Sequence, residues 1–342
     1  MGVKSLAFWV TKAYARDEIF NEQSKLNRDN CLAPFRSLKR QIEYNGGTCH
    51  TQDVFREAGL TPNIVLFLDI PAAPVSQLLG NWSDRVRKWV ILQECEVIIS
   101  RNWQTSFHEQ FDIIFTWHDR LVDNKKYYKL NFSQDFPESI CKNSARTKFC
   151  AVIAGNKKSN HPRELYSKRV EAIHWFEDNH PEKFDLYGLK WDKHTLFGMP
   201  VGRVLNKISV LQPFLKPVFP SYKGKIASKI PVLEQYKFAI CYENAKDIEG
   251  YITEKIFDCF FAGCIPIYWG ANNVSNHIPK ECYIDRLAFG SYEDLYQYLT
   301  TMSSKEYQRY LENIDDYLKS SQAFPYTSDY FAYVVAEKLS RE

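Results

Sequence analysis

Residues 236–274 constrain the fold more than any other part of the chain, because hydrophobic and polar residues alternate there in blocks. An apolar run leads into a polar loop, a helical pattern, a tight turn and a second apolar run. This order is typical of a β/α/β unit in a parallel sheet. The loop and first helical turn hold Glu243, Asn244 and Lys255, and a helix N-terminus beside a lysine favours phosphate. The segment therefore predicts an α/β fold with a site suited to a nucleotide diphosphate.

The rest of the chain repeats this alternation of strands and helices in two halves. The first half has predicted strands at 6–10, 63–70, 88–93 and 111–117, with helices that include 34–44 and 75–79. The second half opens with predicted strands at 149–156 and 184–188, on either side of a helix at 164–179. The pattern predicts two Rossmann-like domains that face a cleft. A polar stretch near 120–147 puts the predicted boundary between domains 1–147 and 148–342.

Composition narrows the class of protein. The chain has 342 residues and a net charge of +3, which is too weak to indicate a nucleic-acid partner. Its nine cysteines are odd in number and include no C-x-x-C pair. Scattered thiols in apolar runs are typical of a reduced protein, so we expect a cytoplasmic location.

Neither end of the chain predicts a membrane-spanning helix. The apolar run at 5–10 is short and is followed by charged residues, so it reads as a first strand. The tail at 326–342 is amphipathic. We expect it to pack on the core, and the alternative is peripheral contact with a partner or with the inner face of a membrane.

Several common catalytic motifs are absent from the sequence. It has no G-x-G-x-x-G, no G-x-x-x-x-G-K-[ST] and no H-E-x-x-H, which argues against dinucleotide redox enzymes, P-loop enzymes and zinc proteases. It also has no D-x-D, the carboxylate pair that holds a metal on many sugar diphosphates. If the chain handles a sugar diphosphate, its own cations must neutralise the phosphates.

Three motifs in order resemble one known family. The first is Tyr242-Glu243-Asn244, the second is Y-I-T-E-K at 251–255, and the third is I-P-I-Y-W-G at 265–270. Together they resemble the α1,3-fucosyltransferases of glycosyltransferase family 10, and in particular the stemless bacterial-type members. The resemblance implies a GT-B fold, GDP-fucose as donor and no required cofactor. It also implies inverting transfer to a glycan hydroxyl, O3 of N-acetylglucosamine or glucose in a β-galactoside.

The same resemblance implies roles for residues of the C-terminal domain, which would bind the donor. Lys255 is expected to hold the diphosphate, and Glu254 to accept hydrogen bonds from hydroxyls of the donor's sugars. Asn244 and Tyr251 match positions that touch the nucleotide sugar, with a turn asparagine and a core tyrosine as the structural alternatives. Glu243 is the exception, because it can instead tie the loop to the sheet.

The family also places an arginine on the helix that follows the strand at 149–156, where its planar fork grips the diphosphate. Spacing to the next strand favours Arg169, with Arg163 as second choice. A solvated helix arginine is the structural alternative.

The N-terminal domain is expected to bind the acceptor and supply a catalytic base. Inverting transfer needs a carboxylate to take the proton of the acceptor hydroxyl. Glu94 at the end of a predicted strand is the preferred base, and Glu96, two residues on and on the same strand face, is the alternative. Both match the family's acidic position only in part, since the usual S-P is missing. The pair His118-Asp119 is a further, less favoured candidate.

The sequence therefore predicts a fucosyltransferase that uses GDP-fucose and an oligosaccharide or glycoconjugate acceptor. Two alternatives stay open. One is a GT-B transferase for another nucleotide-activated 6-deoxyhexose, and the other is a non-catalytic glycan-binding protein.

Overall fold

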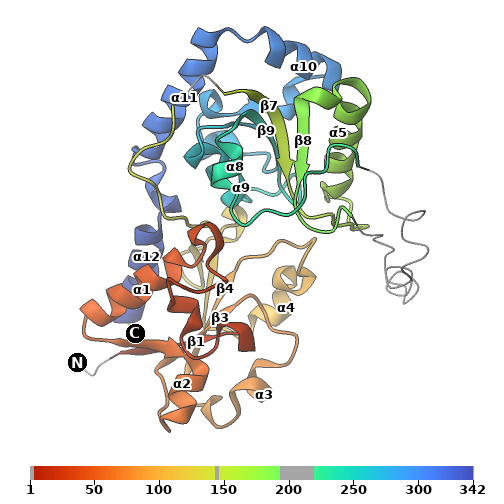
Figure 1. Cartoon of the computed structure of the whole chain (residues 1–342). Coiled ribbons are helices and arrows are strands. Elements are labelled where there is room, and N and C mark those ends of the chain that lie inside the picture. Colours follow the sequence, from red (N-terminus) through yellow and green to blue (C-terminus); the bar gives the residue numbers. More distant parts are fainter. Residues whose placement is uncertain (1–3, 143–145, 193–218, 342) are drawn as a thin grey trace. The chain divides into compact units, whose positions relative to one another are not determined.

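The computed structural model describes residues 4–142, 146–192 and 219–341 (Figure 1). The chain forms two compact units. Unit 1 comprises Met1–Phe136, Ile248–Glu254 and Lys319–Glu342, and unit 2 comprises Pro137–Asp247 and Lys255–Leu318. These bounds differ from a single division at 147, because two later segments pack with the N-terminal half. Each unit is built around one parallel sheet.

The sheet of unit 1 has six strands in the order β2-β1-β3-β4-β5-β6, and every neighbouring pair is parallel. The strands are β1 (Ser5–Trp9), β2 (Thr48–Thr51), β3 (Ile64–Leu68), β4 (Arg87–Leu92), β5 (Ile113–Thr116) and β6 (Tyr127–Lys129). The predicted strands β1, β3, β4 and β5 are confirmed. The sequence analysis missed the edge strands β2 and β6, because both are short and carry polar side chains.

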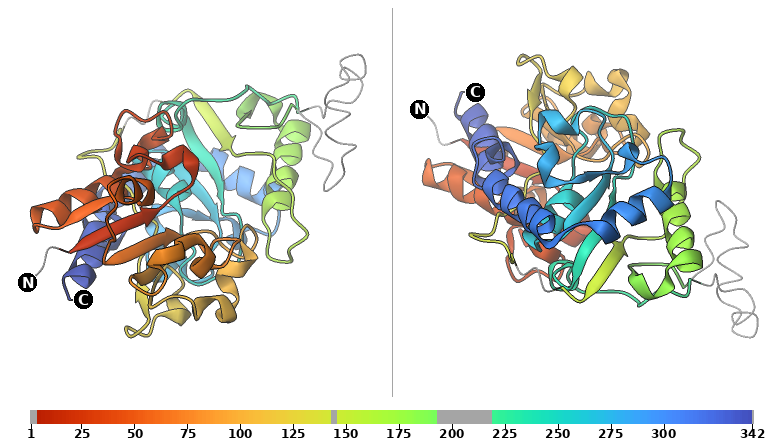
Figure 2. Two further views of the ribbon diagram at one scale, coloured as in Figure 1. Left: turned by 90° about the horizontal axis from the view of Figure 1, so that it is seen from below. Right: turned by 90° about the horizontal axis from the view of Figure 1, so that it is seen from above.

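Helices cover this sheet, and one of them comes from the end of the chain. They are α1 (Ala33–Tyr44), α2 (Gln52–Glu57), α3 (Val75–Leu79), α4 (Thr105–His108) and α12 (Ser328–Ser340). Both views in Figure 2 show α12 beside α1, which it contacts along its length. The Thr327 hydroxyl accepts a hydrogen bond from the Tyr330 N–H and so caps the start of α12.

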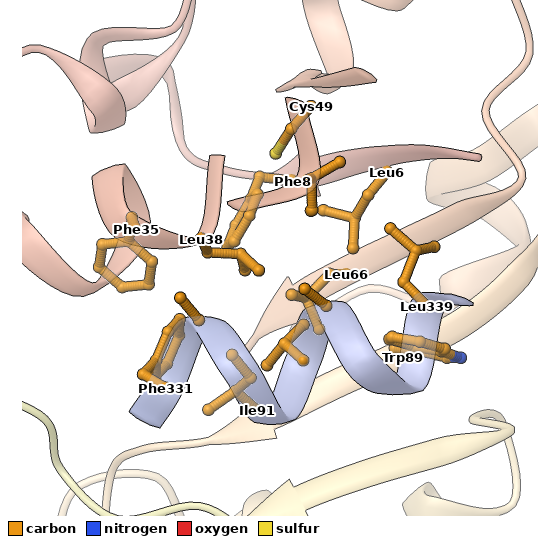
Figure 3. Packing of buried hydrophobic residues seen from close by; sticks show 14 of the residues in the cluster. Leu6, Phe8, Phe35, Leu38, Cys49, Leu66, Trp89, Ile91, Phe331 and Leu339 are labelled. Carbon is orange, nitrogen blue, oxygen red and sulfur yellow. The ribbon is translucent and has the colours of Figure 1, made fainter. Parts of the chain in front are cut away.

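The C-terminal helix completes the core of unit 1, as the amphipathic pattern of the tail predicts. Phe331 and Leu339 of α12 point into the same cluster as Phe8, Phe35 and Trp89 (Figure 3). Phe35 and Phe331 meet edge to face, with ring centroids 5.6 Å apart. Since burial of large apolar side chains is the main stabilising term in folding, unit 1 depends on the last helix of the chain.

The sheet of unit 2 has five parallel strands in the order β11-β10-β9-β7-β8. They are β7 (Lys148–Ile153), β8 (Phe184–Tyr187), β9 (Tyr236–Tyr242), β10 (Ile265–Trp269) and β11 (Ile284–Asp285). The helices of this half are α5 (Tyr166–Asn179), α8 (Ile230–Leu233), α9 (Glu254–Phe261), α10 (Tyr292–Thr301) and α11 (Ser304–Leu318). The predicted β/α/β unit is confirmed as β9, α9 and β10.

Two further features bear on the sequence analysis. All nine cysteines are free thiols, and seven of them are buried. Within the described ranges, no helix is both long enough and apolar enough to cross a membrane.

Candidate active site

The carboxyl edge of the unit 2 sheet holds a tightly packed loop after β9. Glu243 is fully buried, and its N–H donates to the carbonyl of Trp269 at 2.8 Å. Gly270 lies so close that a Cβ there would sit 2.5 Å from Cγ of Glu243 and 2.4 Å from the Tyr268 hydroxyl. Only glycine fits at this position, which explains the Gly that ends the third sequence motif.

Lys255 and Glu243 form an ion pair at this edge. The Lys255 Nζ lies 3.2 Å from Oε2 of Glu243, and the two side chains are 24% and 0% exposed. A carboxylate that is shielded from solvent requires a positively charged or hydrogen-bonding partner. Lys255 in the first turn of α9 supplies the positive charge. This geometry supports the structural interpretation of Glu243: it ties the loop to the sheet and orients the lysine.

Arg169 on α5 fixes the same loop from the other side. Its side chain is buried, and its Nη2 donates to the carbonyls of Tyr242 at 2.6 Å and Glu243 at 2.7 Å, and to Oδ1 of Asn244 at 3.1 Å. The Nε also donates to the Tyr242 carbonyl at 3.2 Å. These donors therefore serve main-chain and amide oxygens, and the direct grip on a diphosphate stays a prediction.

Arg163, the second-choice arginine, reaches the same loop through its main chain. Its carbonyl accepts from the Lys246 N–H at 2.9 Å, and the Leu165 N–H donates to the Asn244 carbonyl at 3.1 Å. Between these bonds lies an antiparallel bridge from Glu164 to residue 245. Arg163 itself is exposed. Both candidate arginines thus lie beside the Asn244 loop, one buried beneath it and one at its surface.

The second sequence motif divides between the two units. Residues up to Glu254 pack with unit 1, whereas Lys255 belongs to unit 2. Tyr251 is buried, with its ring centroid 4.7 Å from that of Trp117 and 6.1 Å from that of Phe132. Its surroundings are those of a core tyrosine. The predicted contact of Asn244 and Tyr251 with the nucleotide sugar stays a prediction, and each belongs to a different unit.

Gly250 allows this segment to approach the unit 1 sheet. Its φ is +79°, and a Cβ there would lie 2.3 Å from the Trp117 carbonyl. The N–H of Asp119 also donates to the Glu249 carbonyl at 3.4 Å. Any other residue at position 250 would push the loop off the strand end.

Glu94 lies in a turn that the half-buried Asp69 organises. Oδ1 of Asp69 accepts from the N–H groups of Gln93 at 2.7 Å and Glu94 at 3.0 Å. The Glu94 carbonyl in turn accepts from Nδ2 of Asn102 at 3.0 Å and Nε1 of Trp103 at 3.1 Å. The main chain of the predicted base is therefore held on both sides, which is what a positioned catalytic group requires.

Asp69 and Asn102 support each other in this network, and the sequence analysis missed both. Asn102 Nδ2 donates to Asp69 Oδ1 at 2.6 Å, and burial raises the pKa of Asp69. Asp69 has a φ of 58°, a left-handed conformation that Asp and Asn tolerate best. The sequence feature that could have drawn attention to Asp69 is its place as an acidic residue near the end of the apolar run at 63–70.

The prediction that Glu96 shares a strand face with Glu94 is wrong. β4 ends at Leu92, and Glu96 lies in a turn in which the Ile98 N–H donates to the Cys95 carbonyl at 2.9 Å. The bonds from Asp69 turn the chain before Glu96 is reached. Two-residue spacing therefore says nothing about the direction of its side chain.

The His118-Asp119 pair follows β5, and its partners favour a loop role. Asp119 forms an ion pair with Lys129. The ring of His118 stacks on that of Trp117 at an interplanar angle of 8°, and burial lowers the pKa of the imidazole. The carboxylate that a histidine base would need is thus engaged with a lysine.

A cavity of about 400 Å³ opens at the carboxyl edge of the unit 1 sheet. Its walls include residues at the ends of β1 and β3 and residues that follow β4, β5 and β6: Trp9, Leu68, Gln93, Trp117 and Asn131. Glu254 of the second motif also lines it. Ligands of open parallel sheets bind at this edge, so unit 1 has a preformed space next to a residue of the family motif.

In the parts of the chain that the structure describes, no group of three or more His, Cys, Asp or Glu side chains is arranged to hold a metal ion. The positive charges near the Asn244 loop include those of Lys255, Arg169 and Arg163, and that of Lys246 within the loop.

Comparison with known proteins supports the resemblance seen in the motifs. Residues 217–331 match the family described as glycosyltransferase family 10 (fucosyltransferase) C-term. The alpha-(1,3)-fucosyltransferase FucT of Helicobacter pylori is 35% identical over 74 residues, which is 22% of this chain and 15% of that protein. The alpha-(1,4)-fucosyltransferase of Arabidopsis thaliana is 40% identical over 67 residues, or 20% and 16% of the two chains.

A third relative is the GDP-fucose protein O-fucosyltransferase 3 of Gallus gallus, 34% identical over 84 residues, which is 24% of this chain and 18% of the relative. The chain thus matches less than a fifth of the length of each of these three relatives. The sequence similarity lies in one part of each protein.

Solved structures resemble the chain over most of its length. An alpha1,3-fucosyltransferase with GDP-fucose superposes with a TM-score of 0.53 at 15% identity, covering 98% of this chain and 90% of the other. An alpha-glucosyltransferase in complex with UDP-glucose and DNA gives a TM-score of 0.60 at 11% identity, with 100% of both chains covered. At such identities the likeness concerns the fold, and it confirms the predicted GT-B class. The match over residues 217–331 confirms the predicted resemblance: this region is similar to the C-terminal domain of the fucosyltransferases of glycosyltransferase family 10.

Proposed function

We propose that the protein is an inverting fucosyltransferase that transfers L-fucose from GDP-fucose to a hydroxyl of a β-galactoside-type glycan. The observation that carries this proposal is the ion pair of Lys255 with the buried Glu243 at the first turn of α9, inside the segment that matches the family. A lysine held in place at a helix N-terminus is suited to a diphosphate.

The donor is proposed to bind along the Asn244 loop of unit 2. Lys255 would contact the diphosphate directly, and the buried Arg169 would hold the loop carbonyls away from the phosphate oxygens. Arg163, exposed at the same loop, is the alternative direct ligand. Because these residues supply positive charge themselves, we propose that transfer requires no metal cofactor.

Glu94 is the proposed base. As the acceptor oxygen forms its bond to the anomeric carbon, its proton passes to the Glu94 carboxylate, and the bond from the anomeric carbon to the diphosphate breaks. The hydrogen bonds that hold the main chain of Glu94 support this role. Lys255 stabilises the charge that grows on the departing GDP.

The acceptor is proposed to be a glycan hydroxyl, O3 of N-acetylglucosamine or glucose. The names of the relatives include a 4-galactosyl-N-acetylglucosaminide 3-alpha-L-fucosyltransferase and a protein O-fucosyltransferase, so a protein hydroxyl is the competing acceptor. The free thiols favour a reducing compartment, and we propose the cytoplasm.

The test is a reaction of purified protein with GDP-fucose and a panel of N-acetyllactosamine, lactose and type 1 acceptors in EDTA, followed by GDP release and product mass. The expected result is a product heavier by one deoxyhexose. A parallel melting experiment with GDP should raise the melting temperature. Transfer from another 6-deoxyhexose donor but not from GDP-fucose would contradict the donor, and glycan binding without any turnover would favour a non-catalytic protein.

A further inference from the structure

The segment Ile248–Glu254 belongs to unit 1, although the residues on both sides of it, Asp247 and Lys255, belong to unit 2. Two left-handed residues allow the chain to turn so sharply: Asp247 has a φ of 59° and Gly250 a φ of 79°. The segment ends where α9 begins. The first turn of that helix, which carries Lys255, is therefore attached directly to a stretch of chain that unit 1 holds.

One loop of unit 1, residues 117–120 after β5, makes close packing contacts with this segment. A Cβ on Gly250 would lie 2.3 Å from the carbonyl of Trp117, so the two main chains touch there. The ring of Trp117 also packs on that of Tyr251, with centroids 4.7 Å apart. The middle of the segment is thus fixed by packing.

Polar contacts from the same loop hold Glu249. The Asp119 N–H donates to the Glu249 carbonyl at 3.4 Å, and the Arg120 guanidinium forms an ion pair with the Glu249 carboxylate. Asp119 is itself paired with Lys129 of β6, so its carboxylate already has a cation of its own. The hydrogen bond from Arg120 lowers the pKa of Glu249. The carboxylate therefore stays ionised near neutral pH, and the pair stays intact.

The ion pair of Arg120 and Glu249 is poorly placed to stabilise the fold. The two side chains are 72% and 24% exposed, and exposed ion pairs add little to folding stability because water solvates the separated charges well. The pair can, however, restrict the segment, so that the turn leading to Lys255 is ordered before a ligand binds. Binding is stronger when the site does not have to be ordered at the same time.

From these observations we infer that Arg120 is a positioning residue for the donor site and acts through Glu249. The ion pair holds the segment on the loop after β5 and so fixes the start of α9, where Lys255 contacts the diphosphate. The inference rests on the proposed function, which makes Lys255 a diphosphate ligand. It adds a residue that lies outside residues 217–331, the region that matches the family.

The experiment measures the Kd of GDP and the steady-state kinetics of Arg120→Glu, Glu249→Arg and the double variant with both changes. Each single variant brings like charges together. We therefore expect the Kd of GDP and the KM for GDP-fucose to rise about fivefold, with the KM for the acceptor unchanged. The melting temperature without ligand should also be unchanged, since the pair is exposed. The double variant restores opposite charges and should return both donor constants to within about twofold of their natural values.

Arg341→Glu is the matched control, because Arg341 is 69% exposed and also pairs with a glutamate, Glu337 of α12. It should leave the Kd of GDP unchanged. A lower melting temperature with an unchanged Kd of GDP in Arg120→Glu would show a purely structural role and overturn the inference. A double variant that binds GDP as weakly as the single variants would also overturn it, since the effect would then not pass through Glu249.

The natural protein separates this inference from the proposed function. If GDP neither binds to it nor raises its melting temperature, the proposed function itself is wrong. If GDP binds to the natural protein and to all three variants with the same Kd, the role of Arg120 is wrong and the donor assignment stands.

Discussion

At the carboxyl edge of each sheet one charged side chain anchors the loops, and the two anchors, the half-buried Asp69 and the buried Arg169, have opposite charge. In unit 1 the carboxylate of Asp69 gathers N–H donors from the turn that contains Glu94. In unit 2 the guanidinium of Arg169 donates to the carbonyls of Tyr242 and Glu243. Each anchor has the charge that suits the role proposed for its edge. The cation Arg169 lies beside the loop proposed to bind the diphosphate. The anion Asp69 lies beside Glu94, which is proposed to accept a proton. The proposed function therefore predicts a different electrostatic role for each loop.

The largest expected effect concerns the base of unit 1. Glu94→Gln should lower kcat about a thousandfold, because the amide cannot accept the proton of the acceptor hydroxyl. Stabilisation by GDP should be unchanged, since the donor half is untouched. Steady-state kinetics checks the first point and thermal melting the second.

Glu96→Gln is the matched control, because Glu96 lies in the following turn. It should retain most of the activity. If the Glu96 variant loses activity and the Glu94 variant does not, the roles of the two carboxylates are reversed.

Substitution of Lys255 tests the proposed donor site at the carboxyl edge of the unit 2 sheet. Lys255→Ala should lower kcat about a hundredfold, because the departing diphosphate loses a cation. It should also lower the melting temperature, since the buried Glu243 loses its partner. Lys305→Ala, an exposed lysine of α11, is the control and should change neither quantity.

A double variant separates the two effects of Lys255. Adding Glu243→Gln to Lys255→Ala removes the buried charge, so the melting temperature should recover while kcat stays low. Recovery of both would mean that Lys255 acts only as the structural partner of Glu243.

Variants of Arg169 and Arg163 distinguish a residue that holds the loop in place from one that binds the diphosphate. Arg169→Lys keeps the positive charge but loses the planar guanidinium group and its several N–H donors. It should reduce the free energy of unfolding by about 2 kcal/mol. Arg163→Ala changes an exposed residue and should leave stability unaltered. A rise in KM for GDP-fucose with Arg163→Ala alone would identify it as the diphosphate ligand, and no rise would leave Lys255 in that role.

The fold of unit 2 was predictable because its signals are local. The apolar blocks on either side of the polar loop gave β9, α9 and β10 in the right order, and their hydrophobic pattern depends on neighbours in sequence. Arg169 was singled out through the family resemblance, and spacing to the next strand favoured it over Arg163. What it bonds to was not predicted, because its acceptors, the carbonyls of Tyr242 and Glu243, lie far away in the chain.

The organisation of unit 1 depended on contacts that no local pattern encodes. The packing of Tyr251 on Trp117 assigns the start of the second motif to unit 1, and only the folded chain reveals it. Asp69 was overlooked because its role rests on a left-handed backbone and on three partners at a distance. The error over Glu96 has the same origin, since a bend set by Asp69 replaced an assumed straight strand.

The smallest expected effect is a pH dependence of stability at Asp69. Burial raises its pKa, so the folded protein retains a proton at pH values where the unfolded chain, with an ordinary value of 3.8, has lost it. Stability therefore falls as the pH rises from 3.8 through the raised pKa, and the loss is complete above it.

Asp69→Asn keeps the acceptor oxygen, tolerates the φ of 58° and cannot ionise. Its free energy of unfolding relative to the natural protein should increase over that pH range, as urea melts at a series of pH values would measure. Asp69→Ala should instead be destabilised by about 1–3 kcal/mol at every pH, because it leaves the partly buried N–H groups of Gln93 and Glu94 without their acceptor. A flat difference between Asp69→Asn and the natural protein would mean that the carboxylate is as well solvated by its N–H partners as by water, and the contrast between the two anchors would then rest on Arg169 alone.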